Sequence, residues 1–156
     1  MEHAKSGDAT MGTAYYAYDA GNKVTEKLLG NDCCAYYEYD AASRVTSLDY
    51  RLSDGSQVVY FGYDYDAGSR IISIRREAGT AIYYTYDDAS RLTGEQWNDS
   101  GGASIYAFEW DYDAVGNRTY EYYNGERTYY TYDAANELTV AHELPDAYTY
   151  LSLIHI

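Results

Sequence analysis

The chain has 156 residues and a formal net charge of −14, from 11 basic and 25 acidic side chains. Leu, Ile, Val and Phe make up only about 15% of the residues, below the roughly 20% under which a strongly charged chain is expected to be disordered. The 23 tyrosines and the single proline, Pro145, argue the opposite, because disordered chains are poor in aromatic residues and rich in proline. Composition therefore excludes two classes of chain: an enzyme with an ordinary aliphatic core, and a proline-rich linker.

Charge, hydropathy and the N-terminal segment restrict the binding partners, the membrane association and the route of export that can be expected. A pI near 4.3 argues against nucleic acid and against an anionic membrane surface. No apolar stretch approaches the roughly 20 residues that span a bilayer, so no membrane insertion is expected. Residues 1–13 are expected to be poorly ordered and lack the apolar run of a signal peptide, so export would need a signal further upstream or another route.

A ten-residue pattern occurs six times along the chain. The copies read YAYDAGNKVT, YEYDAASRVT, YDYDAGSRII, YTYDDASRLT, WDYDAVGNRT and YTYDAANELT, starting at Tyr16, Tyr37, Tyr63, Tyr84, Trp110 and Tyr130. Their second aromatic residues are Tyr18, Tyr39, Tyr65, Tyr86, Tyr112 and Tyr132. A seventh copy starts at Tyr148 and breaks off after YTY. We take these aromatic pairs, with the turn residues below, as the structural repeat motif.

The residue type at each position of the motif has a physical explanation. Aromatic residues two apart fit a strand, because alternate side chains share a face, and we expect their rings to pack in a ladder along successive hairpins. The next residue suits the start of a turn and is Asp19, Asp40, Asp66, Asp87, Asp113 or Asp133. Three residues later come Asn22, Ser43, Ser69, Ser90, Gly116 and Asn136, of which Gly and Asn tolerate positive φ. A base usually follows, namely Lys23, Arg44, Arg70 and Arg91, with Asn117 and Glu137 in the last two copies.

The segments between copies carry turn signals of their own. They are Gly30–Asp32, Ser53–Gly55, Ala78–Gly79, Ser100–Gly102 and Asn124–Gly125, the last being the strongest hairpin signal. Turns every ten or so residues without a helical period predict an all-β antiparallel meander of consecutive β-hairpins, with about twelve strands and almost no helix. The adjacent Cys33 and Cys34 are expected to be free thiols on opposite faces of a strand, with a redox switch as the alternative.

The pattern YxYDxxxRLT, and above all YDAVGNRT at residues 112–119, resembles the YD repeat of bacterial Rhs and wall-associated proteins, toxin-complex shells and teneurins. The resemblance covers residues 14–150. It implies hairpins joined into one long sheet that spirals into a hollow shell around a C-terminal effector. The glycine of the family motif survives only as Gly116, and nothing here resembles the family's self-cleaving DPxG segment. Autoproteolysis and toxin activity are therefore not carried over.

The last six residues, LSLIHI, resemble the translation of a sequencing adapter, so residues 151–156 are interpreted as a non-native tail; a terminal strand is the alternative. No catalytic constellation, metal site or cofactor motif is found. His3, His142 and His155 lack metal-binding spacing. The pairs Asp64/Asp66 and Asp111/Asp113 could share a cation, with turn capping as the plainer interpretation, and a glycosidase-like acid pair is the weakest alternative.

The sequence thus predicts a non-enzymatic structural segment of a YD-repeat shell from a larger secreted or surface bacterial protein of the polymorphic-toxin type. Its expected partners are the rest of its own shell and an enclosed effector, and open strand edges are expected to promote self-association. The alternative is a cell-surface or glycan-binding module that uses exposed tyrosines.

Overall fold

The computed structural model describes residues 14–29, 33–123 and 125–145. The expectations for residues 1–13 and 151–156, for the copy at Tyr148 and for the turn Gly30–Asp32 lie outside these residues. The described residues form twelve strands and no helix, so the predicted all-β antiparallel meander is confirmed. None of the described residues forms a helix that is long and apolar enough to cross a membrane.

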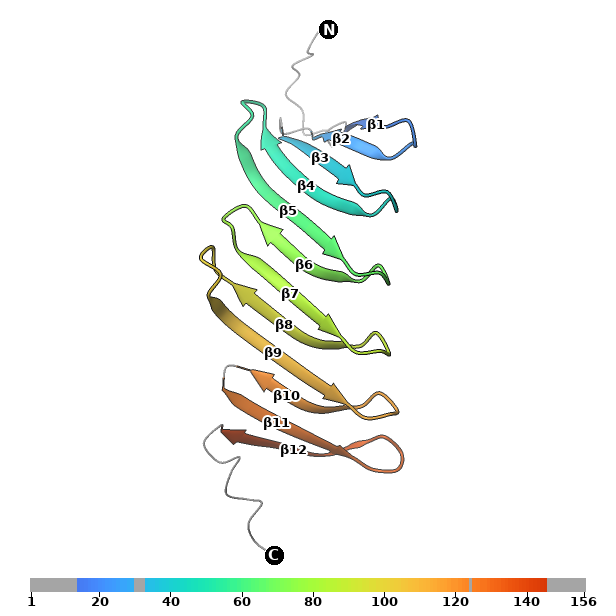
Figure 1. Cartoon of the computed structure of the whole chain (residues 1–156), viewed down its shortest axis with the longest axis vertical. Helices are drawn as coiled ribbons and strands as arrows, with labels where there is room; N and C mark the ends of the chain where they lie inside the picture. Colours follow the sequence, from blue (N-terminus) through green and yellow to red (C-terminus); the bar gives the residue numbers. More distant parts are fainter. Residues whose placement is uncertain (1–13, 30–32, 124, 146–156) are drawn as a thin grey trace, which may run out of the picture. The chain divides into compact units, whose positions relative to one another are not determined.

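The chain divides into two compact units, residues 1–63 and 64–156. The first contains β1 (Tyr15–Tyr18), β2 (Val24–Leu28), β3 (Cys33–Tyr39), β4 (Val45–Leu52) and most of β5 (Gln57–Tyr65). The second contains β6 (Ile71–Arg76), β7 (Ala81–Tyr86), β8 (Leu92–Asn98), β9 (Ser104–Tyr112), β10 (Arg118–Tyr123), β11 (Glu126–Tyr132) and β12 (Leu138–Pro145). Within each unit the strands lie side by side in chain order and pair antiparallel with their neighbours (Figure 1).

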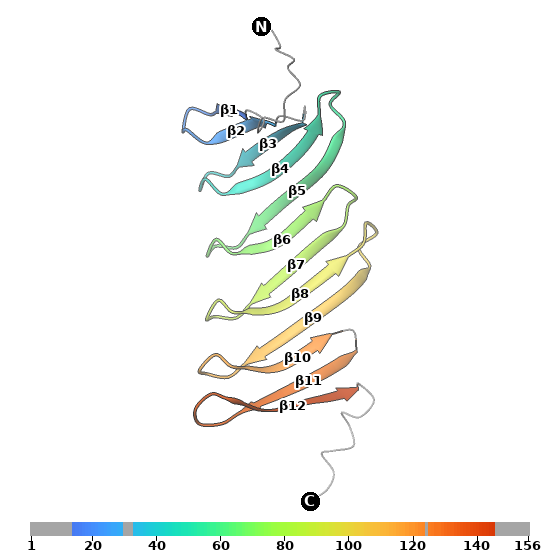
Figure 2. The same cartoon turned by 180° about the vertical axis from the view of Figure 1, so that it is seen from behind.

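All six motifs fold into the same tight turn, and in each unit these turns lie on the same side of the sheet, at one end of the strands (Figure 2). In the fourth copy the N–H of Asp87 donates to the C=O of Arg91 at 3.0 Å, and the N–H of Ser90 donates to the C=O of Asp87 at 2.9 Å. The equivalent pair of bonds recurs in every copy. This is a type I turn followed by a residue in the left-handed region, a common hairpin connection.

The left-handed residue of the turn is the one three places after the aspartate. Its φ is between 60° and 66° at Asn22, Ser43, Ser69, Ser90 and Asn136, and 100° at Gly116. The sequence pattern assigned tolerance of positive φ only to the Gly and Asn members, yet three serines adopt it too. The turn imposes this conformation on serine, at a cost of roughly 1–2 kcal/mol for an ordinary residue.

The turns between copies satisfy the same requirement with glycine. Gly55, Gly79 and Gly102 have φ of 86°, 76° and 86°. The predicted Asn-Gly hairpin is also present, because Tyr123 of β10 pairs directly with Glu126 of β11, and Gly125 has φ of 94°. The glycine signals of the sequence therefore located these connections correctly.

Side-chain alternation gives each unit two distinct faces. The motif face carries the motif aromatics: in the second unit Tyr84 lies opposite Glu95, Glu95 opposite Phe108, and Phe108 opposite Tyr123. The other face, which we call the opposite face, is more polar. On it Tyr83 lies opposite Gln96 across β7 and β8, while Asp111 lies opposite Tyr120 across β9 and β10.

Burial is shallow in both units. The buried apolar residues are Cys33, Ala35, Ala81 and Ile82, and no large described side chain is fully buried. Cys33 is buried and Cys34 half-buried, and both are free thiols, as the sequence predicted. The motif tyrosines are half-buried or exposed, from 58% exposure at Tyr18 downward. Tyrosine thus covers the surface of a sheet and does not fill a closed core, so contacts between neighbouring strands carry most of the packing.

Candidate functional site

The motif aspartate uses both carboxylate oxygens to hold its turn. In the second copy Oδ1 of Asp40 accepts the N–H groups of Ala42 and Arg44, each at 2.9 Å. Its Oδ2 accepts the Nε–H of Arg44 at 2.6 Å. The same 2.6 Å bond joins Arg70 to Asp66 and Arg91 to Asp87. The aspartate therefore fixes the position of the basic side chain in the turn, at the end of the strands.

These hydrogen bonds favour the ionised form of the aspartates. The pKa of Asp40, Asp66 and Asp87 lies below the usual carboxyl value, mainly because backbone N–H groups donate to the carboxylate, with the arginine side chain adding to the effect. At Asp113 desolvation raises the pKa, but the bonds from Asn117 outweigh it and the net shift is downward. Each of these turns is thus built around a carboxylate anion.

The basic side chain then reaches the next copy of the motif. The guanidinium of Arg91 lies over the ring of Tyr112, with 4.8 Å between Cζ and the ring centroid. One of its NH groups donates to the C=O of Asp113 at 2.7 Å. In return the hydroxyl of Tyr112 donates to the C=O of Leu92 at 2.9 Å. We call this set of contacts the inter-repeat staple.

The staple recurs at other junctions within each unit. Arg70 lies 4.8 Å from the Tyr86 centroid and donates to the C=O of Asp87 at 3.1 Å, while the Tyr86 hydroxyl donates to the C=O of Ile71 at 2.8 Å. In the first unit the Lys23 ammonium lies 5.1 Å from the Tyr39 centroid, and the Tyr39 hydroxyl donates to the C=O of Val24 at 2.9 Å. A base and a carbonyl of one copy therefore bind the tyrosine of the next.

The copy at Trp110 keeps part of the staple despite its lost arginine. Asn117 donates to Oδ2 of Asp113 at 3.0 Å and to Oδ1 of Asn136 at 3.1 Å, so it takes over the polar contacts. Arg118, one residue later, lies 5.0 Å from the centroid of Tyr130. The hydroxyl of Tyr132 still donates to the C=O of Arg118 at 2.9 Å. The displaced arginine thus supplies a cation to the first tyrosine of the next copy in place of the second.

The first aromatic residue of each motif has more varied surroundings. The rings of Tyr16 and Tyr18 are 6.4 Å apart, and those of Phe61 and Tyr63 are also 6.4 Å apart. Burial raises the pKa of Tyr37 and of Tyr84. Apart from Tyr130, which meets Arg118 of the preceding copy, these positions contribute packing on the motif face, whereas the second tyrosine links the copies.

The structure separates the two acidic pairs that the sequence suggested as cation ligands. Asp64 accepts the Ser73 hydroxyl at 2.5 Å and pairs with Arg75 at 2.6 Å, while Asp66 holds its own turn. Asp113 is engaged in its turn, and Asp111 lies on the opposite face. Among the residues that the structure describes, no group of three or more His, Cys, Asp or Glu side chains could hold a metal ion.

Several contacts have no signature in the repeat pattern. The indole N–H of Trp97 donates to Glu95 at 2.5 Å, and that of Trp110 donates to Glu121 at 3.1 Å. Phe108 stacks on Tyr123 with ring centroids 4.6 Å apart. All of these residues lie outside the motif except Trp110. Trp97 and Glu95 are two residues apart on β8, whereas the register of β9 and β10 brings Trp110 to Glu121 and Phe108 to Tyr123.

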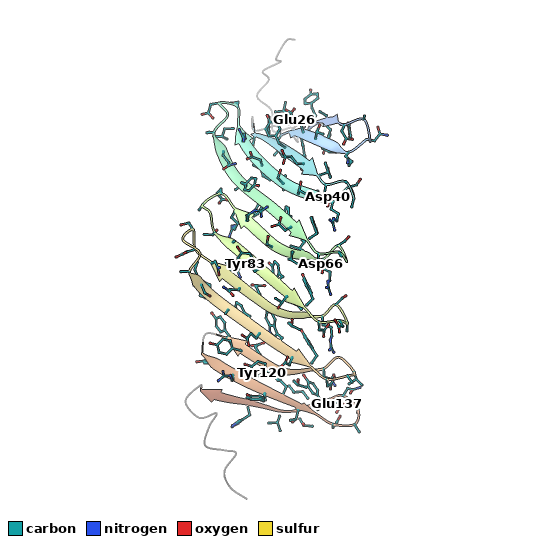
Figure 3. All side chains as sticks on the ribbon, viewed as in Figure 1. Glu26, Asp40, Asp66, Tyr83, Tyr120 and Glu137 are labelled. Carbon is teal, nitrogen blue, oxygen red and sulfur yellow. The ribbon has the colours of Figure 1, made fainter. Side chains whose placement is uncertain are left out.

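Two shallow depressions mark the opposite face. One, of about 340 Å³, lies in the second unit and is lined by Tyr83, Gln96, Glu109, Asp111 and Tyr120, among others (Figure 3 labels Tyr83 and Tyr120). The other, of about 640 Å³, lies in the first unit around Asp49, which binds Arg51 at 2.6 Å and Gln57 at 2.9 Å. Both combine carboxylates with tyrosines and are open to solvent.

No family model and no curated protein matches this sequence. The fold does match solved structures. The TcdB2–TccC3 complex and the TcdB2–TccC3–Cdc42 structure each superpose with a TM-score of 0.72 at 19% identity, over 82% of this chain and 7% of theirs. The Photorhabdus luminescens Tc holotoxin pore with a mutant TccC3 gives 0.71 at 18% identity, with the same coverage. The chain has the fold of a segment of these toxin complexes. It spans about 7% of the length of the chains it matches.

Proposed function

We propose that this chain is a structural segment of a YD-repeat shell, part of a larger secreted or surface bacterial protein of the toxin type that encloses an effector. The observation that carries the proposal is the inter-repeat staple, which joins copy to copy in one direction within each unit. A wall built this way extends by adding copies, and its fold is the one found in the toxin complexes. Residues 14–150 form the wall segment in this proposal.

The motif side chains have a structural task and no catalytic one in this proposal. The aspartates and bases of the motif are occupied with each other, with backbone groups and with the next tyrosine. General acid–base or nucleophilic catalysis needs a titratable group that can approach a substrate, whereas these groups are held in turns. The expected partners are the remaining repeats of the same shell and the enclosed effector.

The test is to express the complete gene product that contains these repeats and to digest it with a protease of broad specificity. We expect the region after the repeats to survive in the intact protein and to be cut rapidly when expressed alone. Equal cleavage rates in the two settings would contradict an enclosing role. A matched sample in mild denaturant should lose the protection, which shows that the folded wall provides it.

Glycan binding is the second candidate function, and the depression between Tyr83 and Tyr120 favours it. Tyrosine rings offer apolar faces to sugar C–H groups, while Gln96, Glu109 and Asp111 offer hydrogen-bond partners for hydroxyls. A glycan array probed with the full chain tests this directly. Saturable binding that is lost in Tyr83→Ala and kept in Tyr106→Ala, on the motif face, would support it. Equal signals for the two variants would exclude this depression as the site.

A further inference from the structure

The inter-repeat staple has a giving half and a receiving half. The giving half is a base four residues after the motif aspartate and the carbonyl of the residue after that base, as in Arg91 and Leu92. The receiving half is the second tyrosine and the carbonyl of the following aspartate, as in Tyr112 and Asp113. Since each copy gives toward the next one along the chain, the staple is directional.

At β1 the receiving half is exposed. Tyr18 is 58% exposed, and all four residues of β1 are exposed. Within residues 14–29, 33–123 and 125–145, the Tyr18 hydroxyl has no hydrogen-bond partner and β1 pairs only with β2. Among the described residues the carbonyl of Asp19 accepts one bond, from Asn22 at 3.0 Å. The equivalent carbonyl of Asp87 accepts two, from Ser90 and from Arg70, so Asp19 has room for a second donor.

At the turn before β12 the giving half carries the wrong charge. The base position holds Glu137, which is exposed and lies on the side of its unit where the motif turns are, as does Asp66 (Figure 3). A carboxylate placed over a tyrosine ring meets the negative face of the ring, and it also repels a carbonyl oxygen where arginine would donate to it. A second copy of this chain that approached β1 with its β12 would therefore lack the staple.

We propose that the edge of β1 that faces away from β2, which pairs with no other described strand, is a docking surface for a β-hairpin that carries Lys or Arg four residues after its turn-opening Asp. The hairpin adds a strand to β1, its cation lies over Tyr18 and donates to the Asp19 carbonyl, and its next carbonyl accepts the Tyr18 hydroxyl. Glu137 excludes this chain's own last hairpin from that role. The proposal depends on the staple geometry alone and not on the shell function.

The experiment makes a second copy of the chain into the missing partner. The full-length double variant Glu137→Arg/Tyr18→Leu has a complete giving half and lacks the receiving tyrosine, whereas the unmodified chain has an intact receiving half at Tyr18. We expect this pair to associate about tenfold more tightly in sedimentation than the unmodified chain with Glu137→Gln/Tyr18→Leu, the matched control that removes the charge without adding a cation.

Two further variants keep the outcome decisive. Replacing the receiving chain by Tyr18→Leu should abolish the gain, and Tyr18→Phe, which keeps the ring, should retain part of it. Both substitutions are at an exposed edge residue, and circular dichroism of each variant serves to check that the sheet is intact. Equal association of the Glu137→Arg and Glu137→Gln partners, or a gain that survives Tyr18→Leu in the receiving chain, would overturn the proposal, whatever the outcome of the protease test of the shell.

Discussion

The guanidinium of Arg91 lies 4.8 Å from the ring centroid of Tyr112, a residue of the next repeat, while the same group stays bonded to Asp87 in its own turn at 2.6 Å. One side chain thus serves two copies of the motif. The local turn orients the arginine, and the arginine joins that turn to its neighbour. Because this geometry recurs, a sheet with very few buried side chains gains stability from the contacts between its repeats.

Arg91→Ala should destabilise the chain by about 1–2 kcal/mol, because it removes a cation–ring contact, the bond to the Asp113 carbonyl and the partner of Asp87. Urea unfolding followed by circular dichroism measures this. Arg75→Ala is the control, since Arg75 makes an exposed ion pair with Asp64 and should cost less than about 0.5 kcal/mol. Equal losses in the two variants would contradict a special role for the staple.

Tyr112→Phe removes only the hydroxyl that donates to the Leu92 carbonyl. We expect a loss of about 0.5–1.5 kcal/mol, the usual net value of one hydrogen bond. Tyr106→Phe serves as the control, because Tyr106 is 43% exposed and its hydroxyl has no hydrogen bond within the described residues. A stability unchanged by Tyr112→Phe would show that the hydroxyl bond contributes nothing.

Ser43→Gly should stabilise the chain by about 0.5–1 kcal/mol, because Ser43 is held at a φ of 64° that glycine adopts without strain. The gain should be smaller for Ser90→Gly, since the Ser90 hydroxyl accepts a bond from Arg70 at 3.1 Å. Thermal unfolding of the two variants compares them. A loss of stability in Ser43→Gly would contradict the strain assigned to this turn.

Acidification should weaken the turns of the motif. The folded pKa of Asp40 lies below its ordinary value of 3.8, so the unfolded chain binds more protons at intermediate pH. The stabilisation is therefore complete above the ordinary value and is lost as the pH falls through 3.8 toward the folded pKa. Reduced charge repulsion acts in the other direction in this acidic chain, so the comparison with Asp40→Asn isolates the effect.

The measurement is the urea midpoint of the unmodified chain and of Asp40→Asn across that pH range. Asparagine keeps an oxygen that can accept the backbone bonds but loses the charge, so the difference between the two chains should shrink on acidification. A difference that stays constant or grows as the pH falls would contradict the assignment.

The sequence predicted the hairpins well because their determinants are local. Asp87 and Ser90 lie in one turn, and the period-two aromatic pair Tyr84 and Tyr86 defines a strand without reference to any other segment. The sequence also predicted a ladder of tyrosine rings, and here it missed the main contact between copies. Arg91 meets Tyr112 of the following copy, and only the strand register and the direction of the turn bring them together.

The non-motif contacts were beyond the sequence for the same reason. Phe108 and Tyr123 stack because β9 and β10 pair in one particular register, and a shift of one residue would move them to different faces. The motif position of the arginine holds Asn117 in the fifth copy, and Arg118 and Asn117 divide the contacts of the missing arginine between them. Such compensation becomes visible only in three dimensions.

The most direct test of the staple is a double-mutant cycle between Arg91 and Tyr112. The variants Arg91→Ala, Tyr112→Leu and their combination are unfolded in urea, and the coupling free energy is taken from the three changes in stability. The staple predicts a coupling of about 1 kcal/mol or more for this pair, and additivity for Arg91→Ala with Tyr132→Leu in the copy beyond. Additive losses within about 0.3–0.5 kcal/mol for Arg91 and Tyr112 would mean that the repeats are not joined through these side chains.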